Sequence, residues 1–511
     1  MNQNLYAFFE QAFPADLNDC CIETHDGLYY SWADLDRATA KLANLLASLK
    51  LPAGSRIAVQ VEKSPEALFL YLATLRAGYV FLPLNTAYQS AEIEYFIGNA
   101  EPAVVVCSPK NFGWVSKLAF TAGTKHVFTL DETRGGSLLE RAAPMADTFA
   151  TVQRKDGDMA AILYTSGTTG RSKGAMLSHG NLSSNAVVLK DYWGWKKGDV
   201  LLHALPIFHV HGLFVASHGA LLNGSKMIWL PKLDVKAILR HLPRSTVMMG
   251  VPTYYVRLLA EPSFGKDGCR NMRLFVSGSA PLLTETFNAF QERSGHTILE
   301  RYGMSETIML VSNPYAGRRI GGTVGKALPG VGVRVADDKG GVCKPGEIGN
   351  IEVKGPNVFS GYWRMPEKTK EEFTADGWFK TGDVGRWGGK SSDGAAIPDD
   401  YLSIVGRSKD LIISGGYNVY PKEIESIVDD MPGVEESAVV GVPHPDFGEA
   451  VVAAVVAKPG AQLDAARMTA ELKSRIANFK VPKQIHVLPE LPRNTMGKVQ
   501  KNLLRQQFAG G

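Results

Sequence analysis

Short apolar runs alternate with helical patterns over residues 56–281, and this rhythm constrains the fold more than any other feature. The runs RIAVQVE, AVVVC, DVLLHAL and KMIWL are separated by helical stretches, an order typical of α/β layers. One helix is expected at residues 65–77, opened by Ser64-Pro65 and closed by Gly78. TVMMGVP and RLFVSGSAP continue the rhythm and end in small or turn residues, where α/β sheets usually place ligands.

The character of the chain changes beyond residue 325. The alternating runs VRVAD and GNIEVKG predict strands of a more antiparallel, β-rich lobe. Residues 388–400, GGKSSDGAAIPDD, predict a surface loop or linker. Helices at 421–430 and 465–477, with the strands SAVVGVP and AVVAAVVA between them, predict a separate small α+β unit. The fold class is therefore α/β: a large domain of layered sub-lobes and a β-rich lobe, followed by a small α+β domain.

Length and composition exclude several classes of protein. The 511 residues exceed one ordinary core, while 45% hydrophobic and 21% charged residues exclude disorder, collagen and coiled coils. The net charge of +4 is spread without long runs, so we expect no nucleic-acid partner and no membrane partner. Five cysteines without metal spacing indicate reduced thiols, and the first residues lack a signal peptide. We therefore predict a cytoplasmic protein.

The most specific segment is YTSGTTGRSKG at residues 164–174, which follows the apolar run MAAIL. Its glycines turn backbone N–H groups toward a phosphate, its hydroxyls add donors and its lysine adds charge. The spacing fails the Walker A pattern, which disfavours a P-loop kinase or GTPase; the competing interpretation is a flexible surface loop. The predicted phosphate-binding residues are Thr165, Ser166, Gly167, Thr168, Thr169, Gly170 and Lys173.

This run resembles the signature of the acyl-adenylate-forming enzymes, the superfamily of acyl-CoA synthetases, luciferases and nonribosomal adenylation domains. Five more segments extend the resemblance in the same order: SGSAP, ERYGMSE, TGD, GRSKDLIISGGYNVYP and PRNTMGK. The resemblance implies that ATP, Mg²⁺ and coenzyme A are used in two half-reactions. A carboxylate attacks the α-phosphate of ATP to give acyl-AMP and diphosphate, and a thiol then displaces AMP.

The resemblance also implies roles for individual residues around the nucleotide. Tyr302 would lie against adenine and Glu306 would hold Mg²⁺, a hard cation that prefers carboxylate oxygen. Taken alone, the segment around them could equally be a helix start, and Gly-Asp at 382–383 an ordinary turn. The remaining implied contacts, to substrate, phosphate or ribose, are Gly278, Ser279, Ala280, Gly303, Ser305, Asp383 and Arg407.

The last hundred residues resemble the small mobile domain of the superfamily. The resemblance implies a large domain of residues 1–406, a small domain of residues 407–511 and a hinge at Lys409. Gly415 and Gly416 would approach the pantetheine tunnel of CoA after rotation. Lys498 would reach the carboxylate and the α-phosphate, then leave before the thiol enters. It would also be a target for a lysine acetyltransferase and deacetylase.

Within the superfamily the sequence resembles the malonyl-CoA synthetases over nearly its whole length. The segments that carry this resemblance are HALPIFHVHGLF, MGVPTYYVRLL, LERYGMSET, KGPNVFSGYWRMPEKT and PRNTMGKVQK. A dicarboxylate carries a second anion that an apolar pocket cannot hold, so a cationic group must meet it. Arg301 is the first candidate, because arginine binds a carboxylate through two parallel hydrogen bonds. Further pocket candidates are Arg257, which could equally be a surface residue, together with His209, Val210 and Met309.

Several functions stay open at this level. Apolar bulk at Val210, Ile308 and Leu310 leaves methylmalonate or another small acid as the substrate in place of malonate. An adenylating enzyme that loads a carrier protein is a close rival, and luciferase chemistry a distant one. A non-catalytic nucleotide-binding protein is disfavoured, because Lys498 and Glu306 are both present.

Overall fold

Two large sheets of mainly parallel strands form the body of the protein, as the alternating apolar runs predict. The computed structural model describes residues 2–165, 172–391, 394–414, 417–444, 448–476, 478–494 and 497–509. The seven-stranded sheet has the order β18 (Gly361–Tyr362), β8 (Lys173–Ser178), β7 (Met159–Thr165), β4 (Val80–Pro83), β3 (Arg56–Gln60), β5 (Val104–Cys107), β6 (His126–Thr129). The nine-stranded sheet has the order β15 (Lys326–Ala327), β14 (Ile308–Ser312), β13 (Leu299–Met304), β12 (Leu274–Ser277), β11 (Val247–Gly250), β9 (Val200–His203), β10 (Lys226–Trp229), β1 (Cys20–Thr24), β2 (Tyr29–Ser31).

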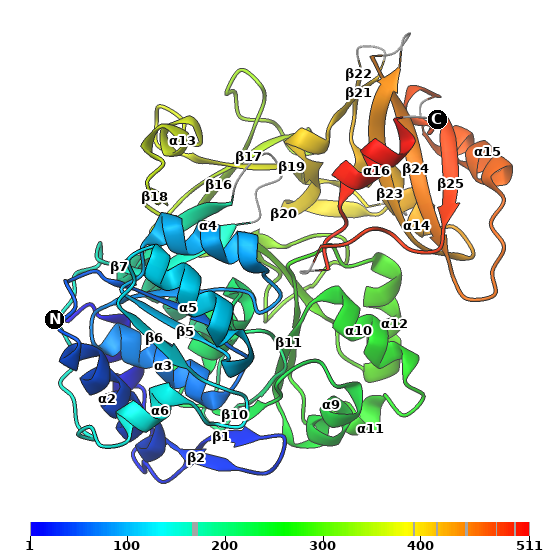
Figure 1. Ribbon diagram of the computed structural model, residues 1–511. Helices are drawn as coiled ribbons and strands as arrows, with labels where there is room; N and C mark the ends of the chain where they lie inside the picture. The colour runs from blue at the N-terminus through cyan, green and yellow to red at the C-terminus, as the bar shows by residue number, and fades with distance from the viewer. Residues whose placement is uncertain are drawn as a thin grey trace.

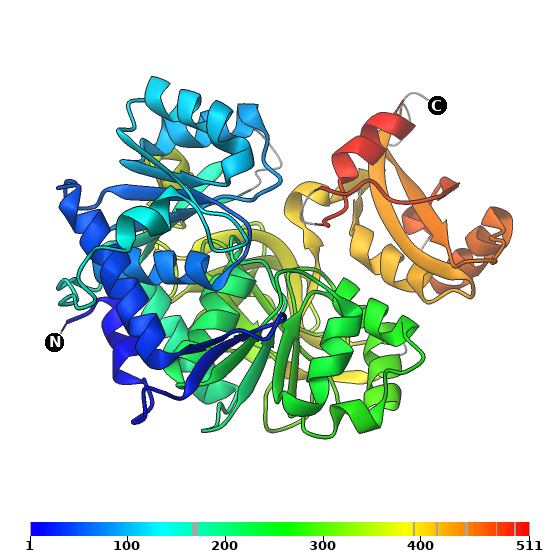
Figure 2. The same ribbon diagram turned by 60° about the horizontal axis from the view of Figure 1, so that its bottom comes forward.

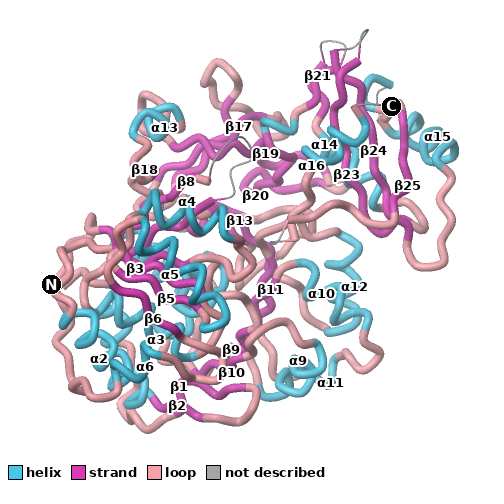
Figure 3. Tube along the Cα trace, in the orientation of Figure 1, coloured by secondary structure: helices cyan, strands magenta, loops and turns pink. Residues whose placement is uncertain are grey.

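Helices cover both sheets and separate them (Figures 1 and 3). In the large domain they are α1 (Leu5–Gln11), α2 (Trp32–Ser48), α3 (Pro65–Arg76), α4 (Ser90–Ala100), α5 (Phe112–Thr121), α6 (Ser137–Ala142), α7 (His179–Tyr192), α8 (His218–Leu222), α9 (Val235–His241), α10 (Pro252–Ala260), α11 (Lys266–Cys269), α12 (Thr284–Ser294) and α13 (Pro366–Glu371). Short 3₁₀ helices cover Pro109–Asn111 and Leu242–Arg244, and a π-helix covers His211–Ser217.

Helix α3 confirms the expected helix at residues 65–77. Ser64 Oγ accepts a hydrogen bond from the N–H of Ala67 at 3.1 Å, and Gly78 turns left-handed with φ +75°. All its residues are buried, so the helix is a core element. The ring of Tyr71 lies 5.0 Å from that of Phe81 on β4, and its hydroxyl bonds His218 on α8. The helix therefore packs between the seven-stranded sheet and the helices of the other sheet.

The β-rich lobe is a four-stranded antiparallel sheet in the order β16 (Gly332–Ala336), β17 (Gly349–Lys354), β19 (Phe379–Lys390), β20 (Ala396–Arg407). The prediction of a loop at 388–400 is wrong for most of its length, because β19 and β20 extend into a long hairpin. Gly389 pairs with Ile397 and Lys390 with Ala396. Turn-forming residues dominate the composition, but a bulge between Trp387 and Gly389 accommodates the glycines within the ladder.

The end of the chain forms the small C-terminal domain. Its sheet contains β21 (Ile412–Ser414), β22 (Tyr417–Val419), β23 (Val434–His444), β24 (Gly448–Ala457) and β25 (Gln484–Leu488). Around it lie α14 (Pro421–Asp429), α15 (Ala465–Arg475), α16 (Lys501–Phe508) and the 3₁₀ helices Ser408–Asp410 and Asn478–Lys480. This confirms the expected α+β unit, although α16 and the short strands β21, β22 and β25 were not predicted.

The small domain, orange and red, stands beside the green helices α10 and α12 (Figures 1 and 2). Lys458 Nζ lies 2.8 Å from Glu285 Oε1 on α12 and joins the two domains there. Among the helices of the described ranges, none has both the length and the apolar character needed to cross a membrane.

Candidate active site

The predicted phosphate loop connects β7 to β8. These strands are antiparallel, and Thr165 pairs with Lys173 at the mouth of their hairpin. The residues between them, including the predicted Ser166, Gly167, Thr168, Thr169 and Gly170, lie outside the described residues. Lys173 Nζ lies 3.2 Å from Glu372 Oε1 and 4.3 Å from the centre of the Tyr362 ring. The lysine is thus held at the entrance of the loop.

Glu306 lies in a tight turn between β13 and β14, so the interpretation of this segment as a helix start is wrong. The carboxylate is buried, which raises its pKa, and the Tyr362 hydroxyl donates to Oε1 at 2.9 Å. Lys173 and Arg407 oppose this shift of the pKa. In the described part of the chain no three metal-ligating side chains cluster. A single buried carboxylate fits Mg²⁺ that arrives with nucleotide phosphates and keeps several waters.

The backbone of the turn around Glu306 is strained at Ile308. Ile308, a β-branched residue, has φ +58°, a conformation that such residues rarely adopt. A Cβ on Gly303 would lie 1.8 Å from the Ile308 carbonyl oxygen, so only glycine fits opposite it. The two residues fix the shape of the turn that carries Ser305 and Glu306.

The residues predicted to bind the nucleoside meet beside β19. The Tyr302 hydroxyl donates to Asp383 Oδ2 at 2.5 Å, and Arg407 Nε lies 3.2 Å from Asp383 Oδ1. The backbone N–H of Asp383 donates to Thr381 Oγ1 at 3.1 Å within β19, so the interpretation of residues 382–383 as an ordinary turn is wrong. Tyr302 precedes Asp383 by 81 residues in the sequence. The fold brings Tyr302, Asp383 and Arg407 into one group that is joined by a hydrogen bond and an ion pair.

Lys498 of the small domain faces this group. Desolvation by the surrounding protein lowers its pKa, as does the positive charge of Arg407, while Asp383 and Glu306 raise it. The Lys498 side chain is exposed. Its acetylation stays a prediction. Lys409 lies in the 3₁₀ helix that follows β20, where burial and Arg407 lower its pKa to about 8. Gly415 and Gly416 lie outside the described residues.

The opposite end of the site is formed by Arg301, Gly278 and the two histidines before and in the π-helix. Arg301 is 4% exposed, and its Nε and Nη2 have no hydrogen-bond partner in the described structure. Burial lowers its pKa to about 9. A Cβ on Gly278 would lie 2.3 Å from Arg301 Cζ, so the glycine makes room for the guanidinium. Burial, Lys498 and Arg301 lower the pKa of His209 to about 3.

The other predicted pocket residues divide between buried and exposed positions. Val210 and Met309 are buried near this end, and Ser279 has the strained φ of +70°. Arg257 and Ala280 are exposed. Arg257 therefore does not share the burial of Arg301, although its charge opposes the rise in the pKa of Tyr254 on the same helix.

Two residues of the site were not predicted. Tyr362 contacts both Glu306 and Lys173, and its position in the sequence gave no signal for either contact. His211 follows the predicted pocket residue His209 by two positions. Its Nε2 is buried without a partner in the described structure, and its Nδ1 lies 3.5 Å from Ser279 Oγ. Burial and the nearby Arg301 lower the pKa of His211 well below its usual range.

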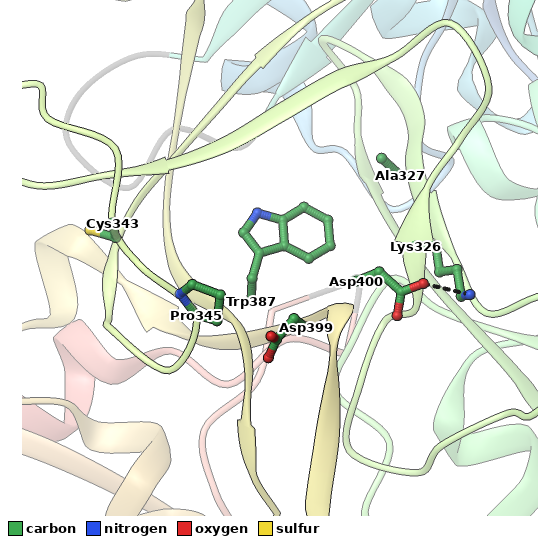
Figure 4. Close-up of a pocket in the computed structure, with 7 residues that line it drawn as sticks. All are labelled: Lys326, Ala327, Cys343, Pro345, Trp387, Asp399 and Asp400. Carbon is green, nitrogen blue, oxygen red and sulfur yellow. Dashed lines mark ion pairs between the residues drawn. The ribbon is translucent and has the colours of Figure 1, made fainter.

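A cavity of about 440 Å³ lies away from these residues, beside the half of the β19–β20 hairpin that is nearer its turn (Figure 4). Trp387 stands at its centre, and Lys326 pairs with Asp400 at 2.7 Å on its wall. None of the predicted site residues lines it. We therefore place the candidate active site between the β13–β14 turn, β19 and Lys498.

Comparison with known proteins decides the family. Residues 10–363 match the model of the AMP-binding enzymes, and residues 423–498 match that of the AMP-binding enzyme C-terminal domain. The chain belongs to the AMP-binding enzyme family. Its CoA ligase relatives support the same conclusion, and it is an AMP-forming acyl-CoA ligase. The chemistry inferred from the six ordered segments is confirmed at this level.

Three relatives illustrate the range of the family. ATP-bound MatB from Rhodopseudomonas palustris is 53% identical with a TM-score of 0.95, covering 100% of this chain and 99% of that one. The apo structure of the same protein gives a TM-score of 0.85 at the same coverage. A malonate–CoA ligase from Arabidopsis thaliana is 33% identical over 99% of this chain and 89% of its own. A feruloyl-CoA synthase from Amycolatopsis is 34% identical over 95% of each.

Proposed function

We propose that this ligase activates a small dicarboxylate, with malonate the best substrate, first as the acyl-AMP and then as the CoA thioester. The unpartnered edge of Arg301 is the observation that carries the proposal. Nε and Nη2 are the two nitrogens whose N–H bonds point the same way, so together they match the two oxygens of one carboxylate. A buried guanidinium without a partner costs several kcal/mol, and the second carboxylate of the substrate would remove that cost.

A carboxylate already present in the protein does not satisfy Arg301. Glu300, its neighbour on β13, accepts the N–H of Gly322 at 3.2 Å instead. Burial raises the pKa of Glu300 to about 8, so this group is largely protonated at neutral pH. Arg301 therefore keeps its full charge for an acid that enters from the site.

In the proposed reaction, two anions must be brought together. Lys498, directed at the group of Asp383 and Glu306, reduces the repulsion between the acid and the α-phosphate, and it stabilises the charge that develops there. Lys173 would hold the outer phosphates, and Tyr302 with Asp383 and Arg407 would fix the nucleoside. Mg²⁺ held by Glu306 would supply further charge neutralisation on the phosphates.

The second half-reaction requires Lys498 to leave. We propose that the small domain, residues 407–511, rotates about Lys409 and brings Gly415 and Gly416 to the pantetheine of CoA. The higher TM-score against the ATP-bound relative than against its apo structure supports an adenylation-like arrangement here. No enzyme nucleophile is required, because the thiol of CoA attacks the acyl-AMP directly.

Methylmalonate is the second candidate substrate. Val210 is buried between His209 and His211, and Ile308 and Met309 are buried on β14 next to the Glu306 turn. The bulk of these apolar residues bears on whether a methyl group fits on the α-carbon. The name of the Arabidopsis relative supports malonate, whereas that of the Amycolatopsis relative refers to an aryl acid. The same fold thus serves acids with and without a second carboxylate.

The test is AMP release with ATP, Mg²⁺ and CoA across acetate, malonate, methylmalonate, succinate and benzoate. We expect malonate to give the highest kcat/KM, with acetate roughly 30-fold lower or more, because acetate leaves Arg301 unpaired. A higher value for methylmalonate would select the second candidate. Equal values for acetate and malonate, or a preference for benzoate, would contradict a dicarboxylate function.

A further inference from the structure

A buried lysine that the reaction does not use lies behind the acid end of the site. Lys63 follows β3 of the seven-stranded sheet and is 9% exposed. Its Nζ donates to the carbonyl oxygens of His203 at 2.9 Å and of Leu230 at 2.7 Å, at the ends of β9 and β10 of the other sheet. It also lies 2.9 Å from His203 Nδ1 and 4.4 Å from the centre of the Trp229 ring.

These contacts fix the tautomer of His203. Three acceptors around one Nζ match the three donors of an ammonium group, although burial lowers the pKa of Lys63. The carbonyl oxygen of Gly212 lies 3.0 Å from His203 Nε2 and can only accept, so Nε2 carries the proton of the neutral ring and donates to it. Nδ1 then accepts from Lys63 Nζ. Ser217 Oγ donates to the same Gly212 oxygen at 2.9 Å.

The chain of hydrogen bonds ends in the π-helix His211–Ser217. A π-helix is rare and usually occurs at a functional site. Here it begins at His211, whose Nε2 is unpartnered, two residues after His209. A Cβ on Gly212 would lie 2.0 Å from the Pro206 carbonyl oxygen, so the segment has little room to shift. Both histidines lie close enough to Arg301 for its charge to lower their pKa.

We propose that Lys63 is a positioning residue for the acid substrate: through His203 it fixes the π-helix that holds His209 and His211 against Arg301. The inference rests on the proposed function only in that an acid must bind at Arg301. Lys63 touches no substrate. It acts by donating to Nδ1 of His203, which favours the one tautomer that can donate to Gly212. The bonds from Lys63 to the carbonyl oxygens of His203 and Leu230 keep its Nζ beside that ring.

A merely structural role for Lys63 gives a different expectation. If the lysine only joined the two sheets, its loss would lower the melting temperature and reduce activity with every substrate alike. A positioning role predicts a selective effect on the acid. In Lys63→Met we expect the KM for the acid to rise roughly tenfold, while the KM for ATP changes less than twofold.

The kinetic test follows diphosphate release with the acid that the wild type uses best, so its outcome does not depend on malonate being that acid. Lys232→Met is the matched control. Lys232 lines the same cavity of about 210 Å³ as Lys63 but is exposed, and it should leave the KM for the acid unchanged. Equal rises in the KM for acid and ATP in Lys63→Met would overturn the proposal.

A double-mutant cycle isolates the tautomer. In His203→Gln the amide Nε2 can donate to Gly212 and has no second tautomer to be selected. We therefore expect Lys63→Met to change the KM for the acid less than threefold in the His203→Gln background. If Lys63→Met has its full effect in that background, the tautomer is not how the lysine acts, and the proposal fails.

Direct observation of the wild type keeps the proposal testable if these variants do not fold. In protein labelled with ¹⁵N at histidine, the His203 signals are identified by their loss in His203→Gln or, failing that, in His203→Asn. We expect a neutral imidazole protonated on Nε2 throughout pH 6 to 8. An imidazolium, or a ring protonated on Nδ1, would overturn the proposal even if the enzyme adenylates the expected acid.

Discussion

The two ends of the candidate site differ in how their polar groups are satisfied. At the nucleotide end, Asp383 accepts from Tyr302 and pairs with Arg407, and Glu306 accepts from Tyr362. At the acid end, Arg301 and His211 keep buried nitrogens without partners in the described structure. A polar group that already has a partner can exchange it for a ligand at little cost. A buried charge without a partner instead favours a ligand that supplies that partner.

This difference in hydrogen-bond partners indicates which end of the site selects between acids. The nucleotide end is organised before ATP arrives, which suits a ligand common to the whole family. The proposed acid end carries a buried cation without a partner in the described structure, which under the proposed function favours an acid with a second negative group. Removing a group from the nucleotide end should therefore affect all acids alike, and removing one from the acid end should affect some acids far more than others.

Lys498→Ala should have the largest effect. The lysine lies close enough to Asp383 and Glu306 for their charges to raise its pKa, and its loss should slow adenylation about 10³-fold for every acid. Diphosphate release measures this step. Thioester formation from supplied acyl-AMP should change only a few-fold, and an equal loss in both assays would contradict the proposed alternation of the small domain.

Glu300→Gln tests why Arg301 has no internal partner. Burial raises the folded pKa of Glu300 from 4.5 to about 8, so wild-type stability is complete below pH 4.5 and is lost as pH rises through 8. Glutamine stays neutral and can still accept from Gly322. The free energy of unfolding of the variant should match that of the wild type at pH 4 and exceed it by about 4 kcal/mol at pH 8.

Thermal unfolding at both pH values measures this gain. A variant that is destabilised at pH 8 would show that Glu300 is ionised and pairs with a cation in the folded protein. Arg301 would then not be free for the substrate.

Tyr302→Phe should have the smallest effect. It removes one hydrogen bond to Asp383, which Arg407 still contacts. We expect the KM for ATP to rise about fivefold, in line with roughly 1 kcal/mol for a single hydrogen bond. The ratio of kcat/KM between malonate and acetate should stay constant, and a change in that ratio would show that the two ends of the site are coupled.

Much of this fold could be predicted from the sequence, because local patterns of apolar and capping residues specify its strands and helices. The apolar runs and the Ser64 cap predicted β3 and α3, and the ordered segments placed Tyr302, Glu306, Asp383 and Lys498 in one site by resemblance. The hairpin at 388–400 was missed because turn-forming residues dominate its composition, while its strand character comes from pairing between β19 and β20.

Contacts between segments that are far apart in the sequence could not be predicted either. Tyr362 meets Glu306 across 56 residues, and no local pattern encodes that distance. Whether a buried atom lacks a partner is likewise decided by everything packed around it. Arg301 could be proposed from its residue type alone, but the two unpaired nitrogens of its fork and the unpaired Nε2 of His211 appeared only in the structure.

The most direct test of the account is the ratio of kcat/KM for malonate to that for acetate, measured in the wild type, Arg301→Met and Arg257→Met. Arg257 is exposed on α10 and serves as the control for removing an arginine. We expect Arg301→Met to lower the ratio roughly 30-fold or more, mainly through malonate, since deleting a buried charged contact costs about 2 to 5 kcal/mol. Arg257→Met should leave the ratio unchanged. An unaltered ratio in Arg301→Met would contradict the claim that this arginine selects the acid.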